Sequence, residues 1–351
     1  MSAVTPRPVT LRLAPLKLGS RRSPMAIAQS RQVAGLITER TGRPVEIVGV
    51  TTLGDVSRAQ LTQIGGTGVF VSALREALLG GELDLAVHSL KDLPTGPAAG
   101  IALAAVPPRD DPRDALVARD GAKLADLPSG ARIGTGSPRR AAQLLGLRGD
   151  LRCVPIRGNA GTRLGKVSEG ELDAVVLAYA GLARIGHVGA VTQVFEPDEM
   201  LPAPGQGALA VECRDDDPEL AALLQAVTDE ASMAAVTAER SLLEALEAGC
   251  SAPIGAYAAV PAGGSRGVVP SGSAAGGSRG VVPAGSRAQL RMQAAVISPD
   301  GSRVLRAHGG APAAGARQLG RDLAAELLRS GAADLISGPG EQANSRNDDV
   351  Q

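Results

Sequence analysis

Aromatic residues are scarce in this chain of 351 residues: Phe, Trp and Tyr together make up 1% of it, and Trp is absent. We therefore do not expect a protein that binds single-stranded nucleic acid by stacking bases on aromatic side chains. Charge of one sign is also lacking in excess, because 36 basic residues balance 36 acidic ones. A non-specific grip on nucleic acid or on an anionic membrane needs excess positive charge, so we expect neither as a partner.

Cysteine is sparse too. Cys153, Cys213 and Cys250 are too few for a disulfide framework and suit a reducing compartment. No CxxC pair or His-rich spacing occurs, so we expect no metal site. The chain lacks a run of about 18 apolar residues that would cross a membrane, and its N-terminal segment lacks the apolar core of a secretory signal. We expect a cytoplasmic protein.

What the chain does contain is an alternation of short apolar segments and helical patterns, from residue 10 to about residue 215. The predicted strands are Leu11–Leu18, Val45–Val50, Leu83–His88, Arg132–Thr135, Leu151–Ile156, Asp173–Ala178 and Ala208–Cys213. Helices are predicted from Ser23-Pro24 to about Arg40, over Val69–Leu79, from Ser137-Pro138, and up to about Glu169. Serine followed by proline is a typical helix start, with serine as N-cap. The alternation predicts α/β layers with largely parallel sheets.

Beyond about residue 232 the pattern starts again, with helices predicted over Ala234–Leu246 and Ala316–Ser330 and a strand over Leu290–Ile297. Residues 261–287 are rich in Gly, Ser and Pro, and GGSRGVVP occurs at 263–270 and at 276–283. Such a composition buries too little apolar surface to offset the entropy of ordering. We predict a flexible surface insertion there, and a disordered tail after about Gly338.

Arginines gather beside the predicted helix starts: Arg21 and Arg22, Arg139 and Arg140, and Arg157 and Arg163 around Gly158–Thr162. The positive end of the helix dipole opposes cations, whereas free N–H groups and arginine forks both bind anions. The alternative is that these arginines are ordinary solvated residues, because only four of the basic residues are Lys and the chain is rich in Arg throughout. The set favours an acidic ligand bound by a two-lobed α/β protein.

Two further motifs carry candidate chemistry. Lys91 and Asp92 follow a predicted strand, at the end where open α/β sheets bind ligands, although the two could also form a plain surface pair. Cys250 lies on a Gly- and Pro-containing turn after a helix, whereas Cys153 and Cys213 lie in apolar strand patterns. Of the three thiols, Cys250 is the one placed to react.

Nine segments, in one order along the chain, resemble the porphobilinogen deaminase (hydroxymethylbilane synthase) family. They are GSRRSPMAIAQ (19–29), GGTGVFVSALREALL (65–79), DLAVHSLKDLP (84–94), RDDPRDAL (109–116), IGTGSPRRAAQL (133–144), IRGNAGTRLGK (156–166), LAYAGLARIG (177–186), LPAPGQGALAVECR (201–214) and EAGCSAPIG (247–255).

The resemblance implies two doubly wound α/β lobes like periplasmic binding proteins, plus a small α+β third domain. Domain 1 would comprise 16–112 and 203–230, domain 2 would comprise 113–202, and domain 3 would comprise 231–338. Residues 1–15 would be an extension and 339–351 a tail. The insertion at 261–287 has no recognised counterpart in the family.

The resemblance also implies an activity. The family condenses four porphobilinogens head to tail, with release of ammonia, on a dipyrromethane cofactor joined by a thioether to a cysteine, here Cys250. Hydrolysis then releases hydroxymethylbilane for tetrapyrrole synthesis, without a metal. Each pyrrole carries acetate and propionate groups, which accounts for the arginines. The enzyme is expected to act as a monomer on its small-molecule substrate.

Matched to this sequence, Asp92 becomes the catalytic residue. The residues implied to bind cofactor or substrate are Arg21, Ser23, Phe70, Ser89, Lys91, Thr135, Ser137, Arg139, Arg140, Arg157, Gly158, Arg163, Arg184 and Gln206. Many relatives carry Lys where this chain has Gln63 and Thr67, and Arg where it has Leu53. These positions would therefore contribute less to binding side-chain carboxylates here, and the segment that covers the site in the family would be held by other contacts.

A non-enzymatic solute-binding module of the same two-lobed architecture is the alternative. It would explain the arginines but leaves Cys250, the third domain and the Lys-Asp loop without a role. A scaffold acting through the repetitive insertion is a third idea, and it rests on composition alone.

Overall fold

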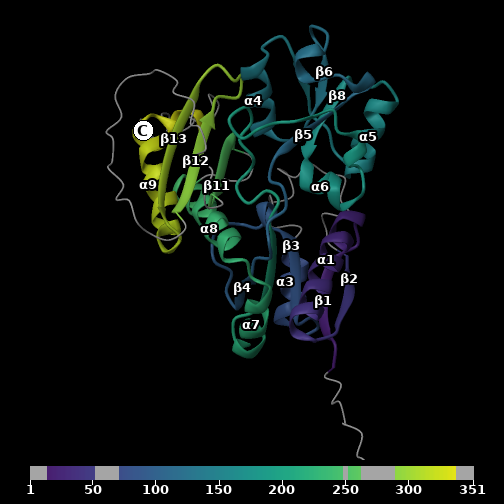
Figure 1. The fold of residues 1–351 in the computed structure, drawn as a ribbon, viewed down its shortest axis with the longest axis vertical. Coiled ribbons are helices and arrows are strands. Elements are labelled where there is room, and N and C mark those ends of the chain that lie inside the picture. The colour runs from purple at the N-terminus through teal and green to yellow at the C-terminus, as the bar shows by residue number, and fades with distance from the viewer. Residues whose placement is uncertain (1–13, 52–70, 248–251, 262–288, 337–351) are drawn as a thin grey trace, which may run out of the picture. The chain divides into compact units, whose positions relative to one another are not determined.

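The computed structural model describes residues 14–51, 71–247, 252–261 and 289–336 (Figure 1). Contacts divide the chain into two compact units. Unit 1 contains Met1–His88, Pro97–Val106 and Leu209–Thr228. Unit 2 contains Ser89–Gly96, Pro107–Ala208 and Asp229–Gln351. Each unit is therefore assembled from three separate stretches of chain.

Unit 1 is built on a five-stranded sheet in the order β2-β1-β3-β10-β4. Its strands are β1 (Leu16–Arg21), β2 (Val45–Val50), β3 (Leu85–Ser89), β4 (Ile101–Ala105) and β10 (Leu209–Arg214). Strand β1 pairs in parallel with β2 and β3, whereas β10 and β4 are antiparallel. The helices are α1 (Pro24–Thr41), α3 (Ser72–Leu79) and α7 (Pro218–Leu224). Leu18, Val33, Ile37, Leu85 and Val211 belong to one buried cluster between the sheet and the helices.

Helix α1 shows why the local signals of the sequence were sufficient. The Ser23 hydroxyl accepts a hydrogen bond from the Ala26 N–H, and Pro24 occupies the first turn, where its missing N–H costs nothing. The helix ends at Gly42, whose φ of 69° is readily adopted by glycine.

Unit 2 contains a second five-stranded sheet in the order β7-β6-β8-β5-β9. Its strands are β5 (Asp114–Ala118), β6 (Arg132–Gly134), β7 (Arg152–Val154), β8 (Ala174–Ala178) and β9 (Gln193–Val194). Strand β6 is parallel to β7 and β8, but β5 runs antiparallel to β8 and β9. The helices of this part are α4 (Pro138–Leu147), α5 (Ala160–Ser168) and α6 (Tyr179–Arg184). Both large sheets are therefore mixed, which corrects the expectation of largely parallel sheets.

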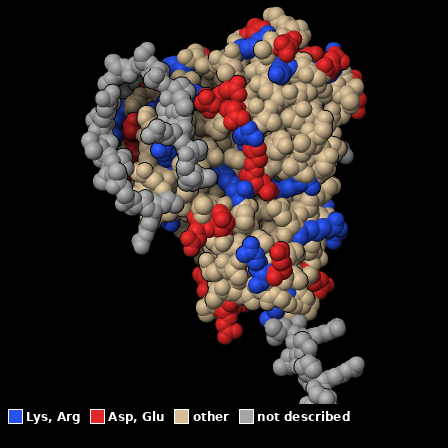
Figure 2. Space-filling view, in the orientation of Figure 1, with Lys and Arg blue, Asp and Glu red and all other residues tan. Residues whose placement is uncertain are grey.

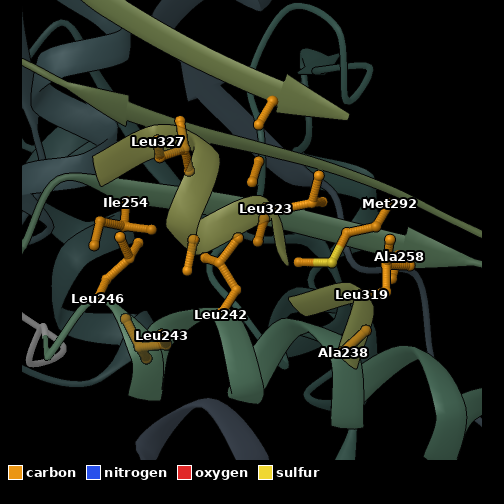
Figure 3. Close-up of a cluster of buried hydrophobic side chains, with 14 of the residues drawn as sticks. Ala238, Leu242, Leu243, Leu246, Ile254, Ala258, Met292, Leu319, Leu323 and Leu327 are labelled. Carbon is orange, nitrogen blue, oxygen red and sulfur yellow. The ribbon is translucent and has the colours of Figure 1, made fainter. Parts of the chain in front are cut away.

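A three-stranded antiparallel sheet completes unit 2, with strands β11 (Ile254–Ala259), β12 (Gln289–Ile297) and β13 (Val304–Pro312). Helices α8 (Glu230–Ala245) and α9 (Ala316–Arg329) pack on it, followed by α10 (Ala332–Ile336). Leu242, Leu323, Leu327 and Met292 are buried between these helices and the sheet (Figure 3). In the first half of β12, the residues that face this core alternate with the exposed Arg291 and Gln293. In its second half, Ala295 and Ile297 of the opposite face are also buried, in a cluster with Ala142 and Leu201.

The predicted elements were largely confirmed, with shifted ends. The first strand is Leu16–Arg21 rather than Leu11–Leu18, and α3 begins at Ser72. Strands β4, β5, β9, β11 and β13 had not been predicted.

Residues 262–288 and 337–351 lie outside the described residues, as do the predictions made for them. The division into three domains stays a prediction. None of the described helices has the length and hydropathy needed to span a bilayer.

Candidate functional site

The parallel strands of unit 2 place their carboxyl ends at one edge of the sheet. Because β5 runs the other way, its first residue, Asp114, pairs with Ala178, the last residue of β8. Asp114 therefore lies at the edge where β6 and β8 end, which is where open α/β sheets bind ligands.

Helix α4 begins at the same edge, directly after β6. Ser137 is its N-cap and accepts a hydrogen bond from the Arg140 N–H, and the Thr135 hydroxyl accepts one from the Ser137 N–H at 3.2 Å. These contacts place Arg139 and Arg140 in the first turn of α4, and both side chains are buried. Two cations at the positive end of a helix dipole are unfavourable unless something compensates them.

Asp114 supplies part of that compensation. Its Oδ1 accepts from Arg140 Nε at 2.9 Å and Nη2 at 2.7 Å, and its Oδ2 lies 2.7 Å from Arg139 Nη2. Burial by itself would raise the pKa of the Asp114 carboxyl, but the two arginine charges outweigh burial and hold this pKa well below its usual range. Sequence reasoning missed Asp114, although a carboxylate that opens the apolar run Ala115–Ala118 was a usable signal.

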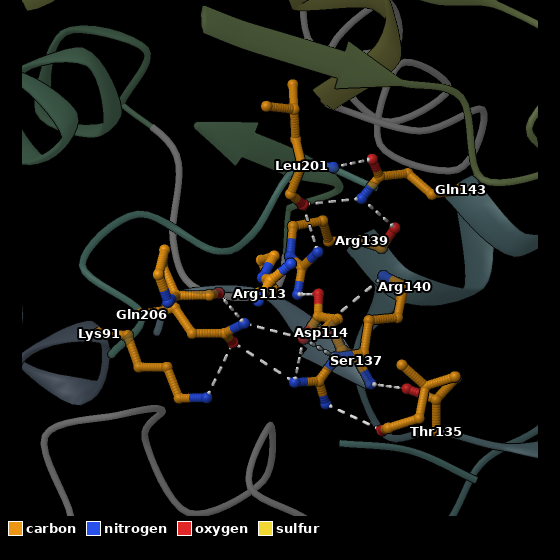
Figure 4. Close-up of polar contacts among 12 residues, drawn as sticks. Lys91, Arg113, Asp114, Thr135, Ser137, Arg139, Arg140, Gln143, Leu201 and Gln206 are labelled. Carbon is orange, nitrogen blue, oxygen red and sulfur yellow. Dashed lines mark hydrogen bonds and ion pairs between the residues drawn. The ribbon is translucent and has the colours of Figure 1, made fainter. Parts of the chain in front are cut away.

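Gln206 and Lys91 extend this network (Figure 4). Gln206 Nε2 donates to Asp114 Oδ1 at 2.8 Å, and its Oε1 accepts from Lys91 Nζ at 3.1 Å and Arg140 Nη2 at 3.3 Å. Lys91 belongs to a short 3-10 helix, Leu90–Asp92, that follows β3 in the chain. Burial, followed by the charge of Arg140, lowers the pKa of Lys91 to about 8. The neighbouring Asp92 side chain is exposed.

Positive charge outnumbers negative charge around this network. Arg163 of α5 adds another cation, and its pKa is lowered by burial and then by the charge of Arg140. Asp114 and Asp92 are the carboxylates that act on Lys91. Arg139 Nε is buried and has no hydrogen-bond partner among the described residues. An acidic ligand would supply the charge and the acceptors that this cluster is short of.

The remaining predicted binding residues of unit 2 have other partners. Arg163 Nε donates to the carbonyl of Gly158, ahead of α5, and Arg157 in the same loop is exposed. Arg184, at the end of α6, donates to Asp110 Oδ2 at 2.9 Å and to the carbonyl of Gly207 at 2.7 Å. Arg184 therefore links the loop that contains Asp110 to the loop that contains Gly207.

Unit 1 holds others of the predicted residues. Arg21 is the last residue of β1 and is half-buried, and Ser23 caps α1. Ser89, the last residue of β3, belongs to unit 2 and is also half-buried. Phe70 and Cys250 lie outside the described residues, and so do the departures at Leu53, Gln63 and Thr67.

The two described thiols are in unreactive settings. Cys213 is fully buried in β10 and Cys153 is half-buried in β7, and burial raises the pKa of each thiol. A thiol with a raised pKa is a poorer nucleophile at neutral pH. Within the described ranges, no three His, Cys, Asp or Glu side chains are grouped so as to hold a metal ion. On the face shown in Figure 2, acidic and basic side chains are interspersed.

We expect Asp114→Asn to destabilise unit 2 by about 3–5 kcal/mol at pH 7, because the change leaves two buried guanidinium groups without a counter-charge. The Asp114 pKa is depressed in the folded state, so its contribution is present above the unfolded pKa of about 4 and is lost as the pH falls through the folded pKa. Urea unfolding of the parent and of the Asp114→Asn variant should therefore give free energies of unfolding that differ at pH 7, and this difference should narrow below about pH 4.

Asp150→Asn is the matched control, since Asp150 pairs with Arg148 on the surface. This control should change stability little at any pH. Equal stability of the Asp114→Asn variant and the parent at pH 7 would contradict the role given to Asp114.

Comparisons with known proteins agree with the geometry. A family model described as "Porphobilinogen deaminase, dipyromethane cofactor binding domain" matches residues 16–222, and "Porphobilinogen deaminase, C-terminal domain" matches residues 233–329. A porphobilinogen deaminase of Thermobifida fusca is 56% identical over 339 residues, covering 93% of this chain and 98% of the relative. Porphobilinogen deaminase 1 of Streptomyces coelicolor is 52% identical over 336 residues, with coverages of 93% and 98%.

Similarity to solved structures is weaker. The VFT2 domain of Bordetella pertussis BvgS gives a TM-score of 0.38 at 20% identity, covering 60% of this chain and 85% of that one. The family models and the two relatives, by contrast, span nearly the whole chain, and they show that it belongs to the porphobilinogen deaminase family.

Proposed function

We propose that this chain condenses four porphobilinogen molecules head to tail on a dipyrromethane primer held by Cys250. Ammonia is released at each condensation, and hydrolysis releases hydroxymethylbilane. The observation that carries this proposal is the buried cationic network around Asp114 in unit 2, in a chain whose family is that of the deaminases. The three sparse cysteines support a reducing, cytoplasmic setting, and we propose that the enzyme acts there as a monomer.

The residues present fit the dipyrromethane cofactor. Its two pyrroles carry acetate and propionate groups. The network offers buried guanidinium donors, among them Arg139 Nε, which has no hydrogen-bond partner in the part of the chain that the structure describes. Arginine forks bind carboxylates in this way, and the helix start adds a favourable dipole. When bound, the cofactor supplies the pyrrole end from which the product chain grows.

The roles proposed for the side chains follow from their settings. Arg139 and Arg140, buried at the start of α4, hold cofactor carboxylates together with Thr135 and Ser137. Arg163 binds the carboxylates of incoming substrate, and Lys91 assists. For the remaining predicted residues, a role in binding cofactor or substrate is supported by the sequence match alone. These residues are Arg21, Ser23, Phe70, Ser89, Arg157, Gly158 and Arg184.

The proposed catalytic group is Asp92. Its exposed carboxylate at the end of a short helix is accessible to substrate. Loss of ammonia from porphobilinogen leaves a cationic pyrrole, and a fixed carboxylate beside it lowers the energy of that charge.

The intact mass of the purified protein, combined with an assay of ammonia release from porphobilinogen, tests the proposal. A covalent excess equal to one dipyrromethane, together with ammonia release, is expected. A mass equal to the bare sequence and no ammonia release would favour a solute-binding module instead.

The arginines are expected to act at different stages. Arg139→Leu and Arg140→Leu should hinder loading of the cofactor, whereas Arg21→Leu and Arg163→Leu should load it and then bind porphobilinogen weakly. Each lost charged hydrogen bond costs about 1.5–3 kcal/mol, or roughly ten- to a hundred-fold in affinity. Native mass spectrometry measures loading, and substrate titration measures affinity.

Arg148→Leu is the control, because Arg148 lies at the other end of α4 and pairs with Asp150. It should load cofactor and bind substrate normally. Normal loading of both Arg139→Leu and Arg140→Leu would contradict the division.

A further inference from the structure

We infer that Gln206 is a positioning residue, whose amide fixes Lys91 Nζ beside the Arg140–Asp114 pair and touches neither cofactor nor substrate. This differs from the binding role that the family resemblance implies for Gln206. The inference rests on the proposed function, in which Lys91 binds acidic groups of the ligand.

The protein itself satisfies the whole amide of Gln206. Its Oε1 accepts from Lys91 Nζ at 3.1 Å and from Arg140 Nη2 at 3.3 Å. Its Nε2 donates to Asp114 Oδ1 at 2.8 Å and to the carbonyl of Pro112 at 2.7 Å. A side-chain amide has two acceptor sites and two N–H groups, so none is left for a ligand. The residue is also fully buried, with an exposed fraction of 0%.

The backbone around Gln206 is built to hold this amide in place. Gly205 and Gly207 have φ values of +76° and +88°, in the region that favours glycine. A Cβ on Gly207 would lie 2.5 Å from the carbonyl oxygen of Asp110, so no larger residue fits there without a backbone shift. The backbone of the segment Gly205–Gly207 therefore lies close to the loop that contains Asp110. Gln206 supplies the one long side chain of this segment, and that side chain points into the network around Asp114.

A buried ion pair fastens the same segment. Arg109 Nε donates to the Gln206 carbonyl at 2.8 Å, and Arg109 Nη1 and Nη2 donate to Glu239 of α8 at 2.7 and 3.0 Å. Glu239 Oε2 also accepts from the Gly205 N–H at 2.6 Å. The backbone of Gln206 is thus tied to α8, and the amide can act as a fixed acceptor for Lys91.

A fixed acceptor matters because of what surrounds Lys91. Burial and the charges of Arg140 and Arg139 favour its neutral amine, whereas the charges of Asp92 and Asp114 favour the protonated form. The Gln206 oxygen accepts a hydrogen bond from the protonated amine and so adds to the second group. Without that oxygen, Lys91 would lose its charge at a lower pH.

The titration of Lys91 tests the inference without relying on turnover. The chain has four lysines, so competitive acylation of the holoenzyme at a series of pH values, read by peptide mass spectrometry, resolves each one. We expect Gln206→Met to lower the pKa of Lys91 by about one unit or more, since a hydrogen bond to a charged group is lost. Gln206→Glu, which keeps an acceptor and adds negative charge, should raise this pKa.

Gln143→Met is the matched control. Gln143 is also a buried glutamine of unit 2, but its amide bonds to the backbone of Leu201 and of Arg139 and not to the Lys91 amine, so Lys91 should titrate as in the parent. An unchanged Lys91 in folded Gln206→Met would overturn the inference. If that variant does not fold, Gln206→Glu decides alone: a raised pKa supports the inference and an unchanged one overturns it.

A crystal structure of the holoenzyme provides a second readout, and a Gln206 amide in contact with the cofactor would also overturn the inference. Failure of the proposed function is a separate result. It would show as absence of the cofactor and of ammonia release in the parent protein, whatever the Lys91 titration gives.

Discussion

Asp92→Asn is expected to lower porphobilinogen turnover at least about 100-fold, the scale of losing one preorganised electrostatic group. The amide keeps the size of the side chain but removes the negative charge that would face the cation left by ammonia. The side chain is exposed, so the fold and the covalent cofactor should be retained. Single-turnover ammonia release from the holoenzyme is the measurement, with the intact mass as the check on cofactor content.

Two further variants sharpen this test. Asp92→Glu keeps the charge but moves it by one methylene group, so it should retain more activity than the amide. Asp126→Asn is the control, since Asp126 also ends a short 3-10 helix, Leu124–Asp126, with an exposed side chain. It should release ammonia at the parent rate. Near-normal release from Asp92→Asn would assign the catalytic role to another residue.

Cys250→Ala is expected to yield a protein without covalent cofactor and without measurable turnover. The thioether needs a reactive thiol, and the thiols of Cys153 and Cys213 have pKa values raised by burial. Intact mass should equal that of the bare sequence. Peptide mapping of the parent should place the adduct on the peptide that contains Cys250.

The complementary control is the double variant Cys153→Ala with Cys213→Ala. It should carry a full complement of cofactor, because neither thiol is proposed to react. An active Cys250→Ala protein, or an adduct mapped to either of the other cysteines, would contradict the attachment site.

Local signals predicted much of the secondary structure. Ser23-Pro24 and Ser137-Pro138 indicated the starts of α1 and α4, because capping depends on residues only three positions apart. Apolar runs such as Val45–Val50 and Asp173–Ala178 matched strands to within a residue. Strand β5 was missed because it begins at the end of the Pro- and Asp-rich stretch Pro107–Asp114, and β13, VLRAHGGAP, was missed because it contains two adjacent glycines and few large apolar residues.

The functional site was likewise predicted from the sequence only in part. Matching motifs identified Lys91, Asp92, Arg139 and Arg140 as functional candidates, and the family of the chain is confirmed. Nothing in the sequence, however, indicated that one carboxylate would hold both arginines. Asp114 meets them because β5 runs antiparallel to β8, and strand direction is decided by pairing across the sheet.

Sequence by itself thus determined the starts of α1 and α4, most of the strands and the family, since each depends on neighbouring residues or on ordered motifs. The acidic character of the ligand stays a prediction. Only the tertiary structure decided which charges are buried together. Asp114 and Gln206 are 92 positions apart in the chain, yet they share a hydrogen bond of 2.8 Å. Burial strengthens such contacts and shifts the pKa of Lys91, and burial exists only once the sheet and its loops have packed.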